Sequence, residues 1–142
     1  MNLQEDLIRE IVQRVLAQTS TWKQRDPSGA LLIHPGSVQT EPFQGRQDVR
    51  VYDLTTLEEA PNMGAGLMEL LDGADFEWTL TYDEYDYVME GELQIVLDSG
   101  AVLTGRPGDI LFIPKNTHIH FRTPDRARYV YFVYPANWQQ NP

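Results

Sequence analysis

Residues 76–91 of this chain read FEWTLTYDEYDYVMEG, and the rest of the sequence is best interpreted outward from this stretch. Its five acidic side chains stand among aromatic ones, in a run that otherwise has the composition of consecutive β-strands. Carboxylates are costly to bury unless they are paired or bound to a metal ion. A strand region with this many acids is therefore either a solvated face or a functional site.

Short strand-like runs separated by turn residues continue on both sides of this stretch. The turns contain Pro-Gly, Pro-Asn, Asp-Gly and Pro-Asp pairs, which interrupt regular structure. Many short strands without a second convincing helix predict a β-sandwich or barrel rather than a βαβ sheet. We expect strands at Ala30–His34, Arg50–Leu54, Leu67–Leu71, Trp78–Thr81, Tyr85–Met89, Leu93–Leu97, Ala101–Thr104, Asp109–Ile113, His118–Arg122 and Arg128–Tyr134.

The first 18 residues have a different pattern, that of an amphipathic helix. Asn2 is a suitable N-cap, and Glu5 stands three residues later, as in a capping box. Apolar residues at helical spacing form one stripe, and polar residues form the opposite face. The stripe consists of Leu3, Leu7, Ile8, Ile11, Val12, Val15 and Leu16. It either packs on its own domain or docks on another protein.

A polar segment, residues 19–30, follows the expected helix. Pro27 and Gly29 interrupt regular structure there, so we interpret the segment as a linker. Helices that recognise another protein are often short amphipathic segments, and the linker favours this docking interpretation. The expected organisation is therefore a helix at residues 1–18, a linker at residues 19–30 and a β-barrel domain at residues 31–142.

The composition excludes several classes of function. The chain carries 21 acidic and 11 basic residues, a net charge of −10, which argues against nucleic acid and anionic membranes as partners. It has no cysteine, so disulfides and thiolate chemistry are absent. No apolar run is long enough to span a bilayer, and the first residues lack the features of a signal peptide. A cytoplasmic location is expected.

Residues 108–121, GDILFIPKNTHIHF, resemble the second sequence motif of the cupins. Gly108 and Pro114 match the motif. Asn116 stands where the family has glycine, and it is the best other residue for a left-handed backbone position. Ile119 occupies the position of a metal-binding histidine in that motif.

The stretch at residues 76–91 then resembles the first cupin motif. Glu84 and Gly91 match its glutamate and glycine at the six-residue spacing. Counting back through the spacer places Glu77 and Thr79 at its two histidine positions. The resemblance implies a jelly-roll barrel with a pocket between its two sheets. Since these residues and Ile119 supply no imidazole, we expect no bound transition metal and no resident cofactor.

The candidate site follows from these matches. Two carboxylates close together would raise the pKa of one of them and leave a group able to exchange a proton near neutrality. Glu77, Glu84 and Tyr82 are the candidate catalytic residues, in a pocket for a small polar ligand. Further candidate binding residues are Thr79, Tyr87, Asp86 and Ile119. The alternative is that the aromatic members of the stretch are core residues.

Two histidines open a second alternative. His118 and His120 are two residues apart, so they share one face of a strand. If Ile119 points into the barrel, both histidines point outward, whereas a register slip of one residue near Asn116 would reverse this and turn one of them inward. In that case the protein would be a metal-dependent cupin enzyme, an isomerase or dioxygenase, that uses His118 or His120 with Glu84.

A more specific resemblance covers most of the chain from residue 34. Residues 63–69 (MGAGLME), 78–91 (WTLTYDEYDYVMEG), 108–115 (GDILFIPK) and 134–138 (YPANW) resemble the ethanolamine-utilisation cupin family, EutQ. The family likewise lacks the metal-binding histidines. The resemblance implies an accessory protein of a bacterial microcompartment and an acetate-kinase-type activity, for which Mg²⁺ would accompany a nucleotide. The alternative is a non-enzymatic binding or assembly module.

The resemblance also implies partners. Residues 1–18 resemble the encapsulation peptides that recruit cargo to microcompartment shells, so shell or core proteins are expected to bind this helix. Cupins commonly form homodimers, and an aromatic C-terminal segment would contribute to such an interface. Its residues are Tyr129, Tyr131, Phe132, Tyr134 and Trp138. The opposing interpretation is that these side chains are ordinary sheet packing.

Overall fold

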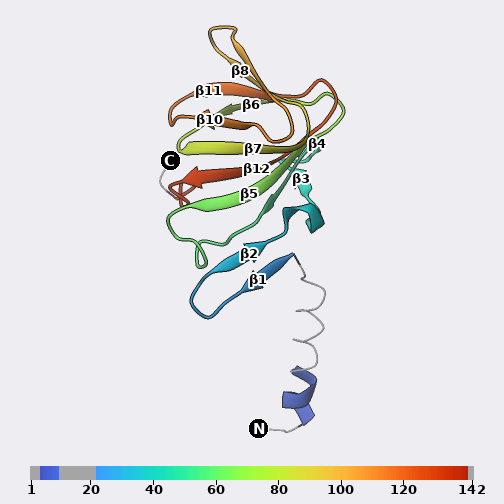
Figure 1. Ribbon diagram of the computed structural model, residues 1–142, viewed down its shortest axis with the longest axis vertical. Helices are drawn as coiled ribbons and strands as arrows, with labels where there is room; N and C mark the ends of the chain where they lie inside the picture. Colours follow the sequence, from blue (N-terminus) through green and yellow to red (C-terminus); the bar gives the residue numbers. More distant parts are fainter. Residues whose placement is uncertain (1–3, 10–21, 141–142) are drawn as a thin grey trace. The chain divides into compact units, whose positions relative to one another are not determined.

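A computed structural model of the chain describes residues 4–9 and 22–140. The chain divides into two compact units, with the boundary between Val38 and Gln39. Figure 1 shows the elements of both units, coloured along the sequence from the N-terminus to the C-terminus.

The first unit contains the beginning of the expected helix and a β-hairpin. Residues 4–9 are helical, and their side chains are exposed. The rest of the expected helix, including Leu3, Ile11, Val12, Val15 and Leu16, lies outside the described residues. No helix in the described part of the chain is both long and apolar enough to cross a membrane.

The first strand of the hairpin occupies a range that we expected to be an irregular linker. Strand β1 (Lys23–Arg25) pairs antiparallel with β2 (Leu31–Ile33), and a 3₁₀ turn, η1 (Pro35–Ser37), follows. Strand β1 was not predicted, because Lys-Gln-Arg lacks both β-branched residues and apolar alternation. Its partner β2 lies within the expected strand at residues 30–34.

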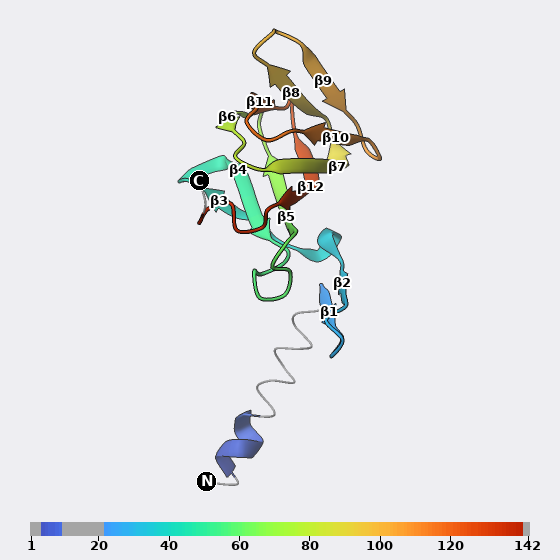
Figure 2. The same ribbon diagram turned by 90° about the vertical axis from the view of Figure 1, so that its left-hand side faces the viewer.

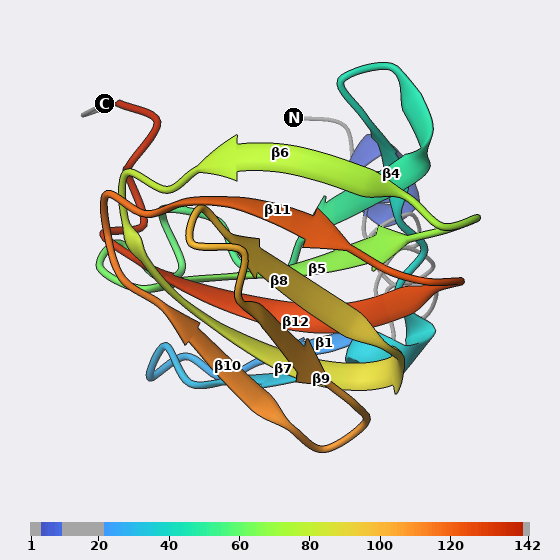
Figure 3. The same ribbon diagram turned by 90° about the horizontal axis from the view of Figure 1, so that it is seen from above.

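The second unit is built from two antiparallel sheets. The described residues of this unit form a six-stranded sheet in the order β10-β7-β12-β5-β4-β3 and a four-stranded sheet in the order β6-β11-β8-β9. The latter order can be followed in Figure 3, and Figure 2 shows β8 and β9 as a hairpin. The strands are β3 (Glu41–Phe43), β4 (Arg46–Asp53), β5 (Gly64–Leu70), β6 (Asp75–Thr79), β7 (Asp83–Gly91), β8 (Leu93–Leu97), β9 (Val102–Gly105), β10 (Ile110–Ile113), β11 (His118–Arg122) and β12 (Ala127–Tyr134).

This arrangement confirms the predicted all-β fold class. The bounds of β8 and β11 agree with the expected strands, and the others are displaced by a few residues at one or both ends. Strand β3 was missed because Glu-Pro-Phe is short and contains proline, which is unfavourable inside a sheet. It pairs only with β4, at the edge of the sheet, where proline is tolerated.

The core lies between the two sheets, where their inner faces meet. Its fully buried members come from both sheets, among them Leu70, Ile95 and Ile119. Burying apolar side chains of this size stabilises the fold by roughly 1.5–3 kcal/mol each. The remaining core residues are Val49, Met68, Ala74, Phe76, Leu80, Tyr82, Val88, Leu93, Ile113, Phe121, Ala127, Tyr129 and Val133.

Strand β7 reverses the usual arrangement of polar and apolar residues. Its inward positions hold Glu84, Asp86 and Val88, all buried, whereas Tyr85 and Tyr87 are exposed to 53% and 43%. Because side chains alternate along a strand, the acids and the tyrosines cannot share a face. The strand at the centre of the acidic stretch therefore brings two carboxyl groups into the barrel.

Two turn positions depend on a left-handed backbone. Asn116 has φ of 70°, which confirms the interpretation of asparagine in place of the motif's glycine. Gly91 has φ of 75°, and a Cβ placed on it would lie 2.0 Å from the carbonyl oxygen of Arg126. This residue ends β7 beside the first residues of β12, so glycine is required there by both conformation and space.

Candidate functional site

The second unit encloses a cavity of about 920 Å³ that opens to solvent. Its walls come from β3 to β7, β11 and β12, together with the loop at residues 55–60 and the C-terminal segment at residues 136–140. A volume of this size suits a small-molecule ligand. The cavity is therefore the candidate functional site.

Aromatic side chains form much of the cavity wall. The Nε1–H of Trp78 donates a hydrogen bond to the hydroxyl oxygen of Tyr82 over 2.8 Å. Trp138, from the C-terminal segment, lies 4.5 Å from Tyr82 and 6.1 Å from Trp78 between ring centroids. Phe43 and Phe76 extend this cluster by edge-on contact at 5.5 Å. The wall thus combines apolar surfaces with a fixed phenolic oxygen.

Glu84 and Asp86 form a buried acid pair on the inner face of β7. Glu84 lines the cavity and is 4% exposed, and Asp86 behind it is fully buried. Oε2 of Glu84 and both carboxyl oxygens of Asp86 have no hydrogen-bond partner among the described residues. Burial, and then the neighbouring charge of Asp86, raises the pKa of Glu84 well above its usual value. Burial also raises the pKa of Asp86.

The acid pair therefore holds protons at a pH where ordinary carboxyl groups are ionised. A protonated carboxyl group can donate a hydrogen bond, which a carboxylate cannot do. The cavity consequently presents an acid as well as hydrogen-bond acceptors to a ligand. This is the feature of the site with the clearest chemical meaning.

Tyrosine hydroxyls surround the acid pair. Burial, followed by the charge of Glu84, raises the pKa of Tyr82, and burial also raises the pKa of Tyr129 and Tyr131. The hydroxyl of Tyr129 donates to the sulfur of Met68 over 2.8 Å. Gly66 provides the space for Tyr131, because a Cβ on this glycine would lie 2.0 Å from the tyrosine ring. These tyrosines act as neutral hydroxyls.

The cavity has an acidic character. The described residues that line it include Glu84 and Asp53 but no lysine, arginine or histidine. Burial raises the pKa of Asp53 as well. An anionic ligand would therefore need a proton or an accompanying cation to balance its charge in this cavity.

Glu77 does not belong to the cavity, contrary to our expectation. Inner positions of β6 are taken by Phe76 and Trp78, so Glu77 lies on the outer face, where its side chain is 66% exposed. Burial of the large aromatic side chains stabilises the fold more than burial of an acid would, and this decides which face of β6 points inward. The two predicted carboxylates, Glu77 and Glu84, are thus not brought together; Asp86 is the partner of Glu84.

The other candidate residues have different positions. Tyr82 lines the cavity, and Thr79 is exposed but also contributes to its lining. Tyr87 was placed wrongly, because it lies on the outer face of the six-stranded sheet. Ile119 is fully buried in the core but is not among the lining residues. The contributions of Asp53, Tyr131 and Trp138 were missed, since these residues are distant from the two motifs in sequence.

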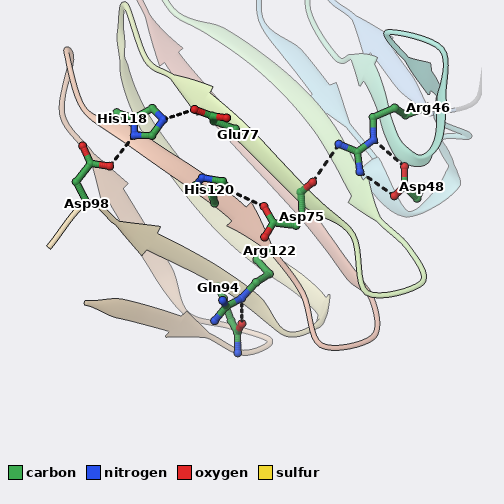
Figure 4. Close-up of polar contacts among 9 residues, drawn as sticks. All are labelled: Arg46, Asp48, Asp75, Glu77, Gln94, Asp98, His118, His120 and Arg122. Atoms are coloured by element: carbon green, nitrogen blue, oxygen red, sulfur yellow. Dashed lines mark hydrogen bonds and ion pairs between the residues drawn. The ribbon is translucent and has the colours of Figure 1, made fainter. Parts of the chain in front are cut away.

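The histidines lie outside the barrel, so the register slip does not occur. Ile119 points inward, and His118 and His120 point outward from β11 with side chains 34% and 38% exposed. Figure 4 shows them beside Glu77 on the outer face of the four-stranded sheet. The alternative site that joined these histidines to Glu84 is therefore wrong, since the two groups lie on opposite sides of a sheet layer.

The aromatic residues near the C-terminus divide between two faces. Tyr129, Tyr131 and Trp138 line the cavity, which agrees with the alternative that these three side chains pack within the barrel. Phe132 and Tyr134 are exposed to 41% and 58%. They share the outer face of neighbouring strands with other exposed apolar residues, namely Tyr85, Tyr87, Ile110 and Phe112. Homodimer formation stays a prediction.

The fold is found in known proteins. An RmlC-like cupin from Shewanella frigidimarina matches 74% of this chain, and 90% of its own, with a TM-score of 0.60 at 19% identity. The two-sheet fold of this chain is therefore the cupin fold.

Sequence comparison then places the chain within the cupins. Residues 1–140 match the family described as ethanolamine utilisation protein EutQ, and the chain belongs to this family. A solved structure of the Clostridium difficile EutQ protein matches 82% of this chain and 95% of its own, with a TM-score of 0.74 and 41% identity. A Salmonella typhimurium structure described as a putative ethanolamine utilization protein Q matches 81% and 94%, with a TM-score of 0.74 and 38% identity.

Three curated relatives carry the name acetate kinase EutQ. The Clostridioides difficile relative is 39% identical over 147 aligned residues, which cover 96% of this chain and 92% of the relative. The Salmonella typhimurium relative is 37% identical over 95% of this chain. This chain spans only 63% of the length of the Salmonella relative.

Proposed function

We propose that this protein binds acetate or a similar small carboxylic acid in the barrel cavity and phosphorylates it as part of ethanolamine utilisation. The observation that carries the proposal is the buried carboxyl group of Glu84 in the cavity wall, with an oxygen that has no partner among the described residues. The name of the relatives, acetate kinase EutQ, supports the choice of substrate and reaction.

Glu84 would hold the acid substrate. Its pKa is raised by burial and by Asp86, so the group retains a proton that it can donate to a carboxylate oxygen of the substrate. That hydrogen bond would offset the cost of placing an anion in an acidic cavity. The aromatic wall of Trp78, Tyr82 and Trp138 would contact the methyl group.

The reaction requires no net proton transfer. One carboxylate oxygen of acetate forms a bond to the γ-phosphorus of ATP as the bond from that phosphorus to the bridging oxygen breaks, which gives acetyl phosphate and ADP. Glu84 would orient the attacking carboxylate. Because no lysine, arginine or histidine lines the described cavity, Mg²⁺ that accompanies ATP would have to balance the phosphate charge.

A direct assay tests this proposal. The intact chain should form ADP and acetyl phosphate from Mg²⁺, ATP and acetate, and calorimetry should detect acetate binding. The Glu84→Gln variant should lose about 100-fold of the acetate-dependent rate, because it removes the acidic proton while keeping the shape. Glu41→Gln, an exposed carboxyl group on β3, is the matched control and should retain the rate.

The two readouts separate the parts of the proposal. Acetate binding that depends on Glu84 without ADP formation would contradict the phosphoryl transfer but support the acid site. An acetate-dependent rate that is unchanged in Glu84→Gln would contradict the role of the cavity.

We also propose that the N-terminal helix recruits the protein to a bacterial microcompartment. Leu7 and Ile8, adjacent members of the apolar stripe, are exposed to 56% and 55%. Exposed neighbouring apolar side chains on a helix suit the groove of a partner protein. A helix-binding protein of the shell or core would be that partner.

Localisation of the intact chain provides the measurement. The double substitution Leu7→Glu with Ile8→Glu should reduce co-purification with microcompartments at least tenfold, since burying each apolar side chain contributes roughly 1.5–3 kcal/mol. Glu5→Gln, on the polar face, should leave co-purification unchanged. Equal recovery of the double variant and the unaltered protein would show that the helix is not the docking element.

A further inference from the structure

A second cluster of ionisable groups lies on the outer face of the four-stranded sheet. His118 and His120 project from β11, and Glu77 projects from the neighbouring strand β6, directly opposite His120 in the register. The potential ligand atoms of these three residues all lie within 4.8 Å of one another. The acid site of the cavity uses none of them.

Each histidine ring is held by a further carboxylate. Nδ1 of His118 lies 2.6 Å from Oδ1 of Asp98, and Nδ1 of His120 lies 2.6 Å from Oδ1 of Asp75 (Figure 4). A carboxylate that accepts a hydrogen bond from Nδ1–H fixes the tautomer and leaves Nε2 as the electron-pair donor, as at His120. The same pairing holds ligand histidines in many metal sites.

The third residue completes a ligand set. Oε1 of Glu77 lies 2.7 Å from Nε2 of His118, which donates a hydrogen bond to this carboxylate. A metal ion would bind between the two atoms by displacing that proton. The ring of His120 lies 5.8 Å from the ring of His118 and nearly perpendicular to it. Two imidazoles and one carboxylate form the protein ligand set of open zinc sites, with water in the fourth position.

We propose that Glu77, His118 and His120 bind one divalent transition-metal ion, with Zn²⁺ as the best match, on the outer surface of the barrel. Tetrahedral zinc with bonds of about 2.0–2.1 Å requires its ligand atoms to be about 3.3 Å apart. Side-chain rotation of these partly exposed groups would widen the 2.7 Å contact between Glu77 and His118 and bring the ligand atom of His120 to the same separation. Asp75 and Asp98 would orient the two histidines rather than bind the ion.

The surrounding charge favours a cation over an anion. Asp75, Glu77 and Asp98 place three carboxylates around two imidazoles, with side chains 52%, 66% and 72% exposed. Their exposure allows an ion to enter from solvent. Since imidazole favours Zn²⁺ over the hard ions Mg²⁺ and Ca²⁺, the site should discriminate between these cations.

Calorimetric titration of the intact chain, freed of any affinity tag, measures the binding. We expect one Zn²⁺ per chain with a dissociation constant in the micromolar range and no comparable binding of Mg²⁺. His118→Asn or His120→Asn should weaken binding at least tenfold, and Asp98→Asn should weaken it roughly 10–100-fold. His34→Asn, the third histidine of the chain, is the matched control and should bind as the unaltered protein does.

A spectroscopic test identifies the ligands without reliance on affinity. The chain contains no cysteine, so His120→Cys introduces a single thiol. With Co²⁺ in place of Zn²⁺, this variant should gain a thiolate-to-cobalt charge-transfer band that the unaltered protein lacks. A Leu103→Cys variant, with an exposed thiol on β9, should not gain the band.

Two results would overturn the proposal. One is the absence of saturable Zn²⁺ binding by protein that retains its normal far-ultraviolet circular dichroism. The other is evidence that the histidines are not ligands. Such evidence would be Zn²⁺ binding that persists in both His118→Asn and His120→Asn, or a His120→Cys variant that lacks the charge-transfer band. Neither result bears on acetate binding in the cavity, because Glu84 lies on the inner side of the barrel.

Discussion

Asp86→Asn is expected to reduce the stability that the protein loses between pH 5 and pH 8. The fall in the free energy of unfolding over this pH range should be about 2 kcal/mol smaller in the variant than in the unaltered chain. In the unfolded chain the carboxyl group of Asp86 has a pKa near 4, whereas burial raises it in the fold. The folded state therefore binds more protons over the intervening pH range. Its free energy of unfolding must fall as pH rises from about 4 through the raised pKa.

The substitution removes this pH dependence in two ways. Asparagine does not ionise, and removing the neighbouring charge also lowers the pKa of Glu84. Urea unfolding between pH 4 and pH 9 should show a flatter profile for Asp86→Asn. Asp72→Asn, in an exposed turn whose left-handed backbone also suits asparagine, is the control and should follow the unaltered profile. Identical profiles for Asp86→Asn and the unaltered protein would refute the cost assigned to this buried acid.

Gly91→Ala is expected to destabilise the barrel by about 3 kcal/mol or more. Its backbone has φ of 75°, and the added Cβ would meet the carbonyl oxygen of Arg126 at 2.0 Å. That oxygen accepts a hydrogen bond from the backbone N–H of Glu92, so it cannot move without breaking the contact between β7 and β12. Thermal unfolding measures the effect as a lower Tm.

Gly100→Ala separates the cost of the left-handed backbone from the cost of the close contact. Gly100 has φ of 90°, but nothing lies within 4 Å of a Cβ placed there. This variant should lose about 1 kcal/mol, the cost of the left-handed backbone alone. If Gly91→Ala lowered the free energy of unfolding no more than Gly100→Ala, the close approach to Arg126 would not contribute to the destabilisation.

Much of the fold could be predicted from local patterns. Strand-like runs separated by turn residues, together with the cupin motif spacing, predicted the all-β barrel. Glu84 was recognised from its spacing to Gly91 in the sequence. The shared parity of Glu84 and Asp86 follows from the period of a strand. Polar strand β1 and Pro-containing β3 could not be predicted, because pairing with neighbours rather than composition holds them.

The candidate site was less predictable, for a physical reason. Motif spacing predicted that Glu77 lies in the cavity. Burial of Phe76 and Trp78 instead turns the other face of β6 inward, so Glu77 points outward. The outer cluster depends on pairing of β11 with both β6 and β8 and on the turn that carries Asp98, and local sequence does not contain this register. Trp138 reaches the cavity through the C-terminal segment, which no local periodicity predicts.

The reversed polarity of β7 makes this strand a place of local frustration. Its own sequence favours burial of Tyr85 and Tyr87, and the native register instead buries Glu84 and Asp86. A competing register therefore exists that would satisfy β7 alone, and the neighbouring strands must exclude it. In natural proteins such conflicts gather where function is built. The same conflict makes β7 the strand that sequence design would correct first, and that correction would remove the acid pair.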